Sequence, residues 1–254
     1  MKVSVITCCL NSESTITDNV LSVNHQNFKD IEHLIIDGGS KDDTVALVRR
    51  LSNRNPVIFS EKDSGPLEAF NKGILRSTGD IVGFLNSDDF FMDSHVVEKI
   101  IQTFEDPTVM GCYANLIYVD RQNVNITRRN WRVGPYSEHA LKKGWAPAHP
   151  TFYVRRSVFN MIGNFSKQFS KNSDFEFALR FFFRHRLKAK YINENWVCMR
   201  MGGISNRTLR HILIQNYENL RACRFHGLQI GWNYILIRIF SRLKQFFSAL
   251  LDHP

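Results

Sequence analysis

The segment at residues 81–89 places the strongest constraint on the fold. An apolar run at residues 81–85 is followed closely by two adjacent carboxylates, Asp88 and Asp89. An apolar run without alternation is typical of a strand that is buried on both faces. In open α/β sheets, ligands bind beyond the carboxyl ends of such strands. The sequence therefore predicts a buried strand that delivers two aspartates to a binding site.

The two carboxylates predict a bound cation at this position. Without a cation they would repel each other and lose solvation. Oxygen ligands of this kind suit Mg²⁺ or Mn²⁺, with phosphate oxygens of a substrate completing the coordination. The alternative is that an aspartate caps the helix that is predicted to begin near Ser94.

The first part of the chain repeats a strand–helix pattern. The predicted strands are residues 2–10, 32–37 and 57–60, and the predicted helices are residues 14–26, 42–51 and 64–75. Three β-α units in succession predict a parallel, Rossmann-like sheet with right-handed crossovers. The turn after the first strand contains no glycine and the chain has no P-loop, so a nucleotide must be held in a different way.

The second part of the chain is less regular. The sequence predicts a helix at 94–104, a strand at 110–119, an extended segment at 126–133, irregular structure at 144–150, a strand at 152–154, a helix at 155–161, a loop at 167–173, a helix at 174–185, strands at 189–192 and 196–200, and a turn at 202–205.

Composition limits the class of protein. With 254 residues, of which 43% are hydrophobic, the chain can form one large α/β domain with an appendage. The net charge of +9 favours an anionic partner, such as a nucleotide, a nucleic acid or an acidic membrane surface. Five cysteines without a C-x-x-C pair argue against a disulfide framework or a zinc site and fit the cytosol. No apolar stretch is long enough to predict a membrane span.

An ordered set of motifs resembles the family-2 glycosyltransferases over roughly residues 2–206. The motifs are Val3-Ser4-Val5-Ile6-Thr7, Ile36-Asp37-Gly38-Gly39-Ser40, Asp63-Ser64-Gly65, Ala69-Phe70-Asn71-Lys72-Gly73, Leu85-Asn86-Ser87-Asp88-Asp89, His149-Pro150-Thr151-Phe152, Gly163-Asn164-Phe165, Asp174-Phe175-Glu176 and Gly202-Gly203-Ile204-Ser205. The chain looks similar to bacterial enzymes of exopolysaccharide, O-antigen or colanic-acid assembly.

The resemblance implies a GT-A fold, which is a Rossmann-like, mostly parallel sheet flanked by helices. It implies a catalytic domain at residues 1–206, with a nucleotide-sugar-binding half at 1–90 and an acceptor-binding half at 91–206, and a helical segment at 207–254. The donor would be a nucleotide sugar, with a UDP-sugar favoured over a GDP-sugar.

The resemblance also assigns residues to the donor site. Asp37 would accept a hydrogen bond from a base N–H, and a turn-capping role is the alternative. Gly38 stands where the family often has a second acidic residue. Mg²⁺ or Mn²⁺ would bind Asp88 and Asp89, because Asn86 occupies the first position of the usual Asp-x-Asp motif. The nucleotide sugar would contact Thr7, Asn11, Asp37, Asp63, Asn71, Lys72 and Asp88, and a solvated helix residue is the alternative for Lys72.

Asp174 matches the catalytic base of the family. One carboxylate must remove the acceptor hydroxyl proton as that oxygen attacks the anomeric carbon, and a single displacement inverts the anomeric centre. The alternative is that Asp174 caps the helix that it begins. His149 and Glu176 are candidates for acceptor contacts, and a structural role is the alternative for His149. The chain lacks a Gln-x-x-Arg-Trp motif and membrane spans, so we expect transfer of one sugar per acceptor.

The carboxy-terminal residues predict two helices, at 209–225 and 234–251. In the second, an apolar stripe faces one side and Arg238, Arg242 and Gln245 face the other. A basic amphipathic helix suits an anionic membrane surface, and packing on the catalytic domain is the alternative. We therefore expect a cytoplasmic protein that lies on the inner face of the membrane and acts on a saccharide or a lipid-linked acceptor.

Two other functions compete with this interpretation. A sugar nucleotidyltransferase shares the nucleotide-binding architecture, but residues 7–11 lack the glycine-rich phosphate loop that such an enzyme needs. A non-catalytic basic module for nucleic acid or lipid would explain the charge but would leave the Asp88–Asp89 pair unexplained. We therefore expect no nucleic-acid partner.

Overall fold

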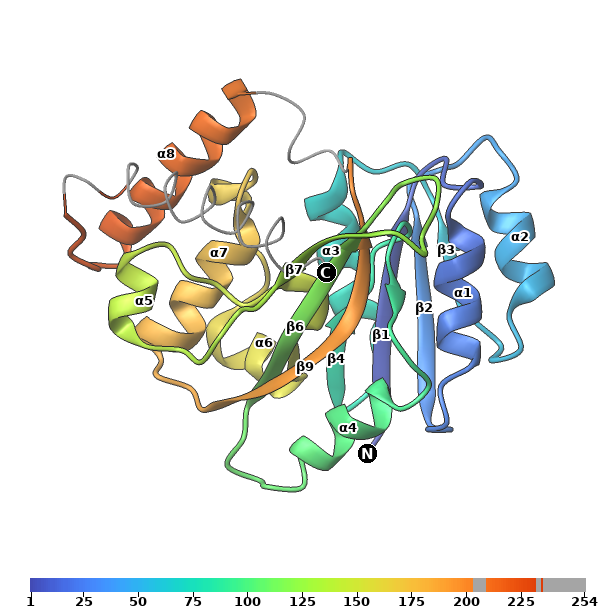
Figure 1. Ribbon diagram of the computed structural model, residues 1–254, viewed down its shortest axis with the longest axis horizontal. Coiled ribbons are helices and arrows are strands. Elements are labelled where there is room, and N and C mark those ends of the chain that lie inside the picture. Colours follow the sequence, from blue (N-terminus) through green and yellow to red (C-terminus); the bar gives the residue numbers. More distant parts are fainter. Residues whose placement is uncertain (203–208, 232–233, 235–254) are drawn as a thin grey trace.

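The amino-terminal half of the sheet is parallel. The computed structural model describes residues 1–202, 209–231 and 234 (Figure 1). β1 (Val3–Cys9) lies between β2 (Ile31–Asp37) and β4 (Ile81–Phe84), and β3 (Val57–Ser60) forms the outer edge. The carboxyl ends of these strands therefore meet at one edge of the sheet, where the Asp88–Asp89 segment follows β4.

Helices cover both faces of this half (Figure 1). α1 (Ile16–Asn24) and α2 (Thr44–Leu51) pack on one face through Val20 and Val48, which share a hydrophobic cluster with Ile35 of β2. α3 (Pro66–Arg76) packs on the other face. A Cβ atom on Gly73 of α3 would lie 2.5 Å from Ile6, so this helix approaches the sheet closely because position 73 is glycine. The three predicted β-α units are confirmed.

The second half adds antiparallel strands. Its elements are β5 (Phe90–Phe91), α4 (Val96–Thr103), β6 (Gly111–Val119), β7 (Thr127–Trp131), α5 (Glu138–Lys142), the 3₁₀ helix η1 (His149–Thr151), β8 (Tyr153–Arg155), α6 (Ser157–Ile162), the 3₁₀ helix η2 (Lys167–Phe169), α7 (Ser173–Ala178), the π-helix η3 (Leu179–Arg184) and β9 (Ala189–Arg200). The strand order is β3-β2-β1-β4-β8-β6-β9-β5, and β7 pairs with β6.

The expected sheet flanked by helices is confirmed, but its pairing is mixed and not mostly parallel. β8 is antiparallel to both β4 and β6, and β5 is antiparallel to β9. β6 and β9 are parallel to each other. The parallel pattern therefore holds in the first half, where each connection contains a helix, and does not extend through the second half.

β9 is one strand where two were predicted. The polar residues Asn193, Glu194 and Asn195 suggested a break, but the strand continues through them with a shift of register opposite Asn115. Asn193 Oδ1 accepts hydrogen bonds from Asn115 Nδ2 at 3.1 Å and from the Tyr191 hydroxyl at 3.0 Å. The short elements β5 and α5 were also not predicted.

α8 (Leu209–Phe225) is confirmed as a helix. Its residues Ala222 and Cys223, with the following Leu228, share a hydrophobic cluster with Phe175 and Leu179 of the α7–η3 segment. This part of the expected carboxy-terminal segment therefore packs against the expected catalytic domain. The predicted turn at 203–205 and, apart from Tyr234, the predicted helix at 234–251 lie outside the described residues. Within the described part of the chain, no helix combines the length and the hydrophobicity that crossing a bilayer requires.

Candidate active site

Asp88 and Asp89 follow β4 but have different surroundings. Asp89 is fully buried, its Oδ2 accepts a hydrogen bond from Asn86 Nδ2 at 3.0 Å, and its Oδ1 accepts one from the Arg200 backbone N–H at 3.3 Å. Asp88 is half-buried, and among the described residues no other residue donates a hydrogen bond to its carboxylate. Asp89 is therefore held by the fold, whereas the oxygens of Asp88 are free to bind a ligand.

Burial raises the pKa values of both carboxyls. For Asp89 the charge of Asp88 adds to the rise, and the pKa lies well above its ordinary value. For Asp88 the charges of Arg200 and Arg121 oppose the effect of burial. A bound cation would stabilise the ionised form of Asp88 at this position.

Arg200 is a site residue that the sequence did not identify. It ends β9, its Nη1 donates to the backbone oxygen of Asp88 at 2.8 Å, and its Nη2 pairs with the carboxylate of Asp18 on α1. Its guanidinium carbon lies 5.3 Å from the ring centroid of Phe90. These partners are distant from Arg200 in the sequence, so no local pattern could have indicated the contact.

The residues present fit a divalent cation, which Asp88 would hold. Within residues 1–202 and 209–231, no cluster of three or more His, Cys, Asp or Glu side chains could hold a metal ion by itself. Mg²⁺ and Mn²⁺ sites in phosphate-handling enzymes commonly use one or two protein carboxylates and complete the coordination with substrate phosphates and water. One free carboxylate beside buried Asp89 matches this kind of site.

Asp37 organises the loop after β2. Its Oδ2 accepts hydrogen bonds from the N–H groups of Gly39 (3.2 Å) and Ser40 (3.0 Å) and from the Ser60 hydroxyl (2.6 Å), and its Oδ1 accepts one from the Ser40 hydroxyl (2.5 Å). Burial alone would raise the pKa of Asp37, but these hydrogen bonds outweigh it and the pKa is lowered. A carboxylate offers about four lone-pair sites. The geometry therefore favours the turn-capping alternative over a base contact.

Asn11 and Asp63 lie against the same loop. The Asn11 backbone N–H donates to Ser40 Oγ at 2.8 Å, and Asn11 Oδ1 accepts from the Lys41 N–H at 2.9 Å. Asp63 Oδ1 accepts from the Gly65 N–H at 2.9 Å. A Cβ atom on Gly38 would lie 3.0 Å from Asp63 Oδ2, so the Asp63 carboxylate occupies the space beside this glycine. The structure thus brings Asn11, the Asp37 loop and Asp63 together.

Three predicted donor residues make structural contacts instead. Thr7 is fully buried, and its hydroxyl lies 3.1 Å from His33 Nε2. Asn71 binds the backbone of Phe165 through both ends of its amide, at 2.9 and 3.0 Å. Lys72 forms ion pairs with Glu61 (3.3 Å) and Glu68 (3.1 Å). Thr7 therefore does not line an open pocket, Asn71 joins α3 to the Phe165 loop, and Lys72 is a surface residue of α3.

Asp174 is exposed in the first turn of α7. The N-cap position is occupied by Asn172, so the capping alternative for Asp174 does not hold. Asp174 Oδ1 accepts a hydrogen bond from the adjacent Phe175 N–H at 2.8 Å. Its carboxylate remains accessible to a substrate hydroxyl.

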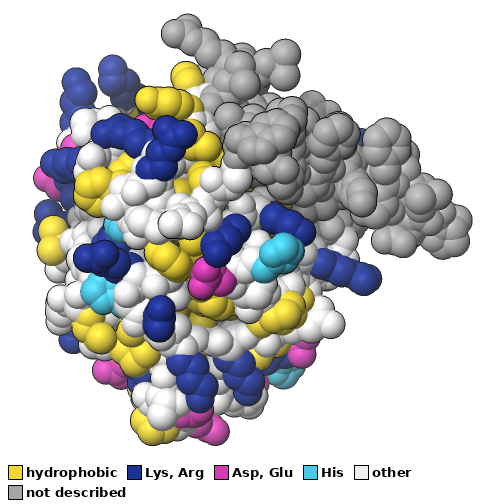
Figure 2. Space-filling view, turned by 90° about the vertical axis from the view of Figure 1, so that its left-hand side faces the viewer, with side chains coloured by type: hydrophobic (Ala, Val, Ile, Leu, Met, Phe, Trp, Pro, Cys, Tyr) yellow, Lys and Arg dark blue, Asp and Glu magenta, His cyan; other side chains and the backbone are white. Residues whose placement is uncertain are grey.

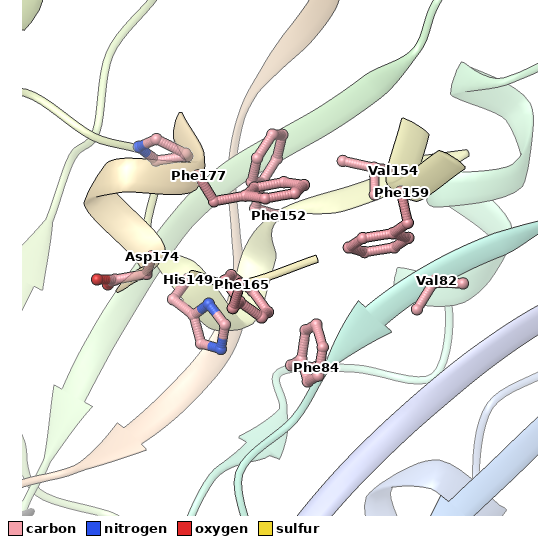
Figure 3. Close-up of a pocket in the computed structure, with 10 residues that line it drawn as sticks. Val82, Phe84, His149, Phe152, Val154, Phe159, Phe165, Asp174 and Phe177 are labelled. Carbon is pink, nitrogen blue, oxygen red and sulfur yellow. The ribbon is translucent and has the colours of Figure 1, made fainter. Parts of the chain in front are cut away.

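Asp174 and His149 line a small aromatic cavity of about 10 Å³, which is room for about one water molecule. Figure 3 shows the His149 ring between Asp174 and the ring of Phe84, and the two rings stack with centroids 5.2 Å apart. Burial lowers the pKa of His149, and the charge of Asp174 acts in the opposite direction. Nε2 of His149 is buried without a hydrogen-bond partner in the described part of the chain. This nitrogen is therefore free to bind a polar group in the cavity.

Glu176 is a buried side chain of α7. It is 2% exposed, and its carboxylate binds Arg180 through Nε (2.8 Å) and Nη2 (2.9 Å) and His226 Nε2 (2.8 Å). Burial alone would raise the pKa of Glu176, but these partners lower it. In this structure the Glu176 carboxylate, which was predicted to contact the acceptor, binds Arg180 and His226.

The comparison with protein families matches this architecture. The family described as glycosyl transferase family 2 matches residues 4–189. An uncharacterised glycosyltransferase of Mycobacterium tuberculosis (strain H37Rv) is 32% identical over 182 residues, which cover 70% of this chain and 68% of the relative.

Solved structures show the same fold. The mannosyltransferase PcManGT from Pyrobaculum calidifontis, in complex with GDP-Man and Mn²⁺, has a TM-score of 0.66 at 16% identity over 98% of this chain and 73% of its own. S. aureus TarS residues 1–349, in complex with UDP-GlcNAc, have a TM-score of 0.61 at 17% identity over 99% of this chain and 80% of that one. The chain spans 44% of the longer TarS chain. The family match and these folds together show that the chain belongs to glycosyl transferase family 2 and has a GT-A fold.

Proposed function

We propose that this glycosyltransferase is inverting, metal-dependent and non-processive, and that it moves one sugar from a nucleotide-sugar donor to a saccharide or lipid-linked acceptor in cell-surface polysaccharide synthesis. The main observation behind this proposal is that the four carboxylates considered for catalysis fall into two pairs with different surroundings. Asp89 and Glu176 are buried and bound to other side chains, whereas Asp88 and Asp174 accept no hydrogen bond from another side chain of the described residues. The two free carboxylates are the ones that the chemistry requires.

Asp88 would hold Mg²⁺ or Mn²⁺ against the diphosphate of the donor. The cation supplies positive charge that stabilises the departing diphosphate. Arg200 binds the Asp88 backbone oxygen and the Asp18 carboxylate, which fixes the segment that presents Asp88. The Mn²⁺ in the PcManGT complex supports a divalent cation as the cofactor.

Asp174 would act as the general base. It removes the proton from the acceptor hydroxyl while that oxygen forms a bond to the anomeric carbon and the bond from this carbon to the diphosphate breaks. The attack comes from the face opposite the leaving group, so the anomeric configuration inverts. His149 Nε2 is buried without a described partner, and it would hold an acceptor hydroxyl or a water molecule beside Asp174.

The donor site would lie beside Asn11, Asp63 and the loop that Asp37 holds in place. We favour a UDP-sugar over a GDP-sugar, and the complexes of TarS with UDP-GlcNAc and of PcManGT with GDP-Man support a nucleotide sugar of one of these kinds. Family membership does not support the nucleotidyltransferase or the non-catalytic module as alternatives.

A thermal-shift screen tests the donor assignment. UDP-, GDP- and dTDP-sugars are added separately to the protein with Mn²⁺. The nucleotide sugars of one nucleobase should raise the melting temperature of the protein more than the others do. A ligand at about 100 times its Kd adds about 2.7 kcal/mol of stability, which corresponds to a shift of about 5–10 °C for a domain of this size. Inorganic diphosphate with Mn²⁺ is the control for phosphate binding alone. Equal small shifts for all compounds would contradict a nucleotide-sugar site.

The proposal that the protein binds an anionic membrane rests on its basic surface and on the basic amphipathic sequence of residues 234–251. Lys and Arg side chains are spread over the face that carries α5 and α8 (Figure 2). Arg221 and Arg224 of α8 are exposed, as are Tyr217 and Phe225. Each Lys or Arg near an anionic bilayer contributes roughly 1 kcal/mol of attraction. We therefore propose a cytoplasmic enzyme at the inner face of the membrane, without a nucleic-acid partner.

Truncation tests the membrane role. Removing residues 235–254 should weaken binding to anionic vesicles, because only part of the basic surface remains on α8, and should leave donor binding intact. This truncation keeps Leu228 and Tyr234, which are buried and would destabilise the domain if removed. High salt should weaken vesicle binding of the full chain because the attraction is electrostatic. An unfolded truncated protein, or a full-length protein that ignores vesicles in a flotation assay, would refute the role.

A further inference from the structure

α8 lies outside the stretch that matches the family, yet it binds the chain on both sides of Asp174. The family match ends at residue 189, and α8 begins at Leu209. Nδ2 of Asn172, the N-cap residue of α7, donates to Oδ1 of Asn219. Glu176, two residues after Asp174, binds His226, which follows α8 directly. The first turn of α7 is thus attached to the α8 segment at two points.

The attachment at Glu176 is a buried hydrogen-bond network around the Glu176–Arg180 ion pair. The side chains of Glu176, His226 and Arg180 are 3%, 9% and 12% exposed. Arg180 binds both carboxylate oxygens, and His226 Nε2 lies 2.8 Å from Oε1. Removing one partner from a buried charged group leaves a desolvated charge without compensation, so each member holds the others in one geometry.

The same network reaches the wall of the aromatic cavity. Arg180 also donates to the backbone oxygens of Ile162, Gly163 (3.0 Å) and Asn164 (2.7 Å). The next residue is Phe165, whose ring lines the cavity beside Asp174 and whose backbone is bound by Asn71 of α3. His226 is therefore linked through Glu176 and Arg180 to the surroundings of Asp174.

Apolar packing fixes the distance between the two helices. Phe169, Phe175 and Leu179 form one side of a cluster, and Ala222, Cys223 and Leu228 form the other. The backbone N–H of Lys171 donates to Glu218 Oε2 at 3.0 Å. The approach to α7 and its first turn are both in contact with the α8 segment.

We propose that α8 is part of the catalytic apparatus, and that His226 and Asn219 are positioning residues that hold the first turn of α7, and with it Asp174, in the orientation that catalysis needs. This inference rests on the proposed role of Asp174 as the base. A misplaced base lowers the rate of the chemical step without changing the affinity for the donor.

His226→Leu tests the inference in the full-length protein. It should lower kcat at least about tenfold with an unchanged KM for the donor, because the donor site lies elsewhere. His226→Gln should recover most of the activity, since its amide can still donate to Glu176. The matched control is His95→Leu, which removes an exposed pair of His95 with Glu98 at 3.1 Å and should leave kcat unchanged.

A double-mutant cycle separates positioning from general damage. In the Asp174→Asn background, His226→Leu should cause no further loss of turnover, because it acts through Asp174. An equal loss in both backgrounds would overturn the inference, as would wild-type kcat in folded His226→Leu. If His226→Leu does not fold, His226→Asn, whose amide is too short to reach Glu176, is judged by the same criteria.

The outcomes for the two proposals are distinct. Near-normal turnover of Asp174→Asn alone would refute the base assignment and, with it, this inference. Loss of turnover in Asp174→Asn together with normal kcat in folded His226 variants would refute only the role of α8.

Discussion

Asp174→Asn should lower turnover by about 10²–10⁴-fold, which is the usual cost of removing a general base. The amide is nearly the same size as the carboxylate but cannot accept the acceptor proton. The Phe175 N–H can still donate to the amide oxygen, so the first turn of α7 should persist. Donor affinity and melting temperature should stay close to those of the unchanged enzyme. Steady-state kinetics with saturating donor measures the loss.

Asp30→Asn is the matched control for this substitution. Asp30 is also exposed, but it immediately precedes β2, at the edge of the sheet opposite the site, so its removal should leave kcat unchanged. Near-normal turnover of Asp174→Asn would mean that another group is the base. Glu176 cannot take that role in this geometry, because it is buried against Arg180 and His226.

The product provides an independent check of the same step. Direct attack by the activated hydroxyl inverts the anomeric centre, so the glycosidic bond should have the configuration opposite to that of the donor sugar. NMR of the product distinguishes the two configurations through the anomeric proton coupling. Retention would contradict a single displacement and the proposed use of Asp174.

Local sequence patterns predicted the helices and strands whose ends are marked by residues that interrupt regular secondary structure. The strand at 57–60 and the helix at 209–225 have the predicted bounds, and α7 begins within one residue of the expected start. β5 has only two residues and owes its existence to pairing with β9, so no local pattern could indicate it. The interruption predicted within β9 was wrong because long-range partners stabilise its polar residues.

In the candidate site, too, local sequence patterns identify only some of the residues. Asp88 and Asp174 lie at element ends, where position alone indicates a role, and the structure leaves both of their carboxylates free of other side chains in the described chain. Asn71, Lys72 and Glu176 have the right chemistry for ligand binding, but partners from other segments occupy them. Arg200 was missed because its role depends on α1 and the β4 end, both far from it in sequence. Tertiary contacts decide which polar residue remains free for a substrate.

Asp88→Asn should abolish most metal-dependent turnover. A cation supplies several kcal/mol of stabilisation to the developing charge on the leaving diphosphate, and each 1.36 kcal/mol is a factor of ten in rate. We therefore expect a loss of at least about 10²-fold at a fixed Mn²⁺ concentration. EDTA should remove the activity of the unchanged enzyme, and added Mg²⁺ or Mn²⁺ should restore it. The measurement is activity as a function of metal concentration in both proteins.

Asp89→Asn distinguishes a metal ligand from a structural carboxylate. Its amide nitrogen would face the Nδ2 donor of Asn86 inside the protein, and an unsatisfied buried donor costs about 1–3 kcal/mol. Asp89→Asn should therefore change the melting temperature and leave the metal affinity unchanged, whereas Asp88→Asn should lower the metal affinity because it removes the carboxylate that would hold the cation. Full turnover in EDTA, or normal metal dependence in Asp88→Asn, would contradict the assignment. Loss of metal affinity in Asp89→Asn without loss of stability would mean that Asp89, and not Asp88, is the metal ligand.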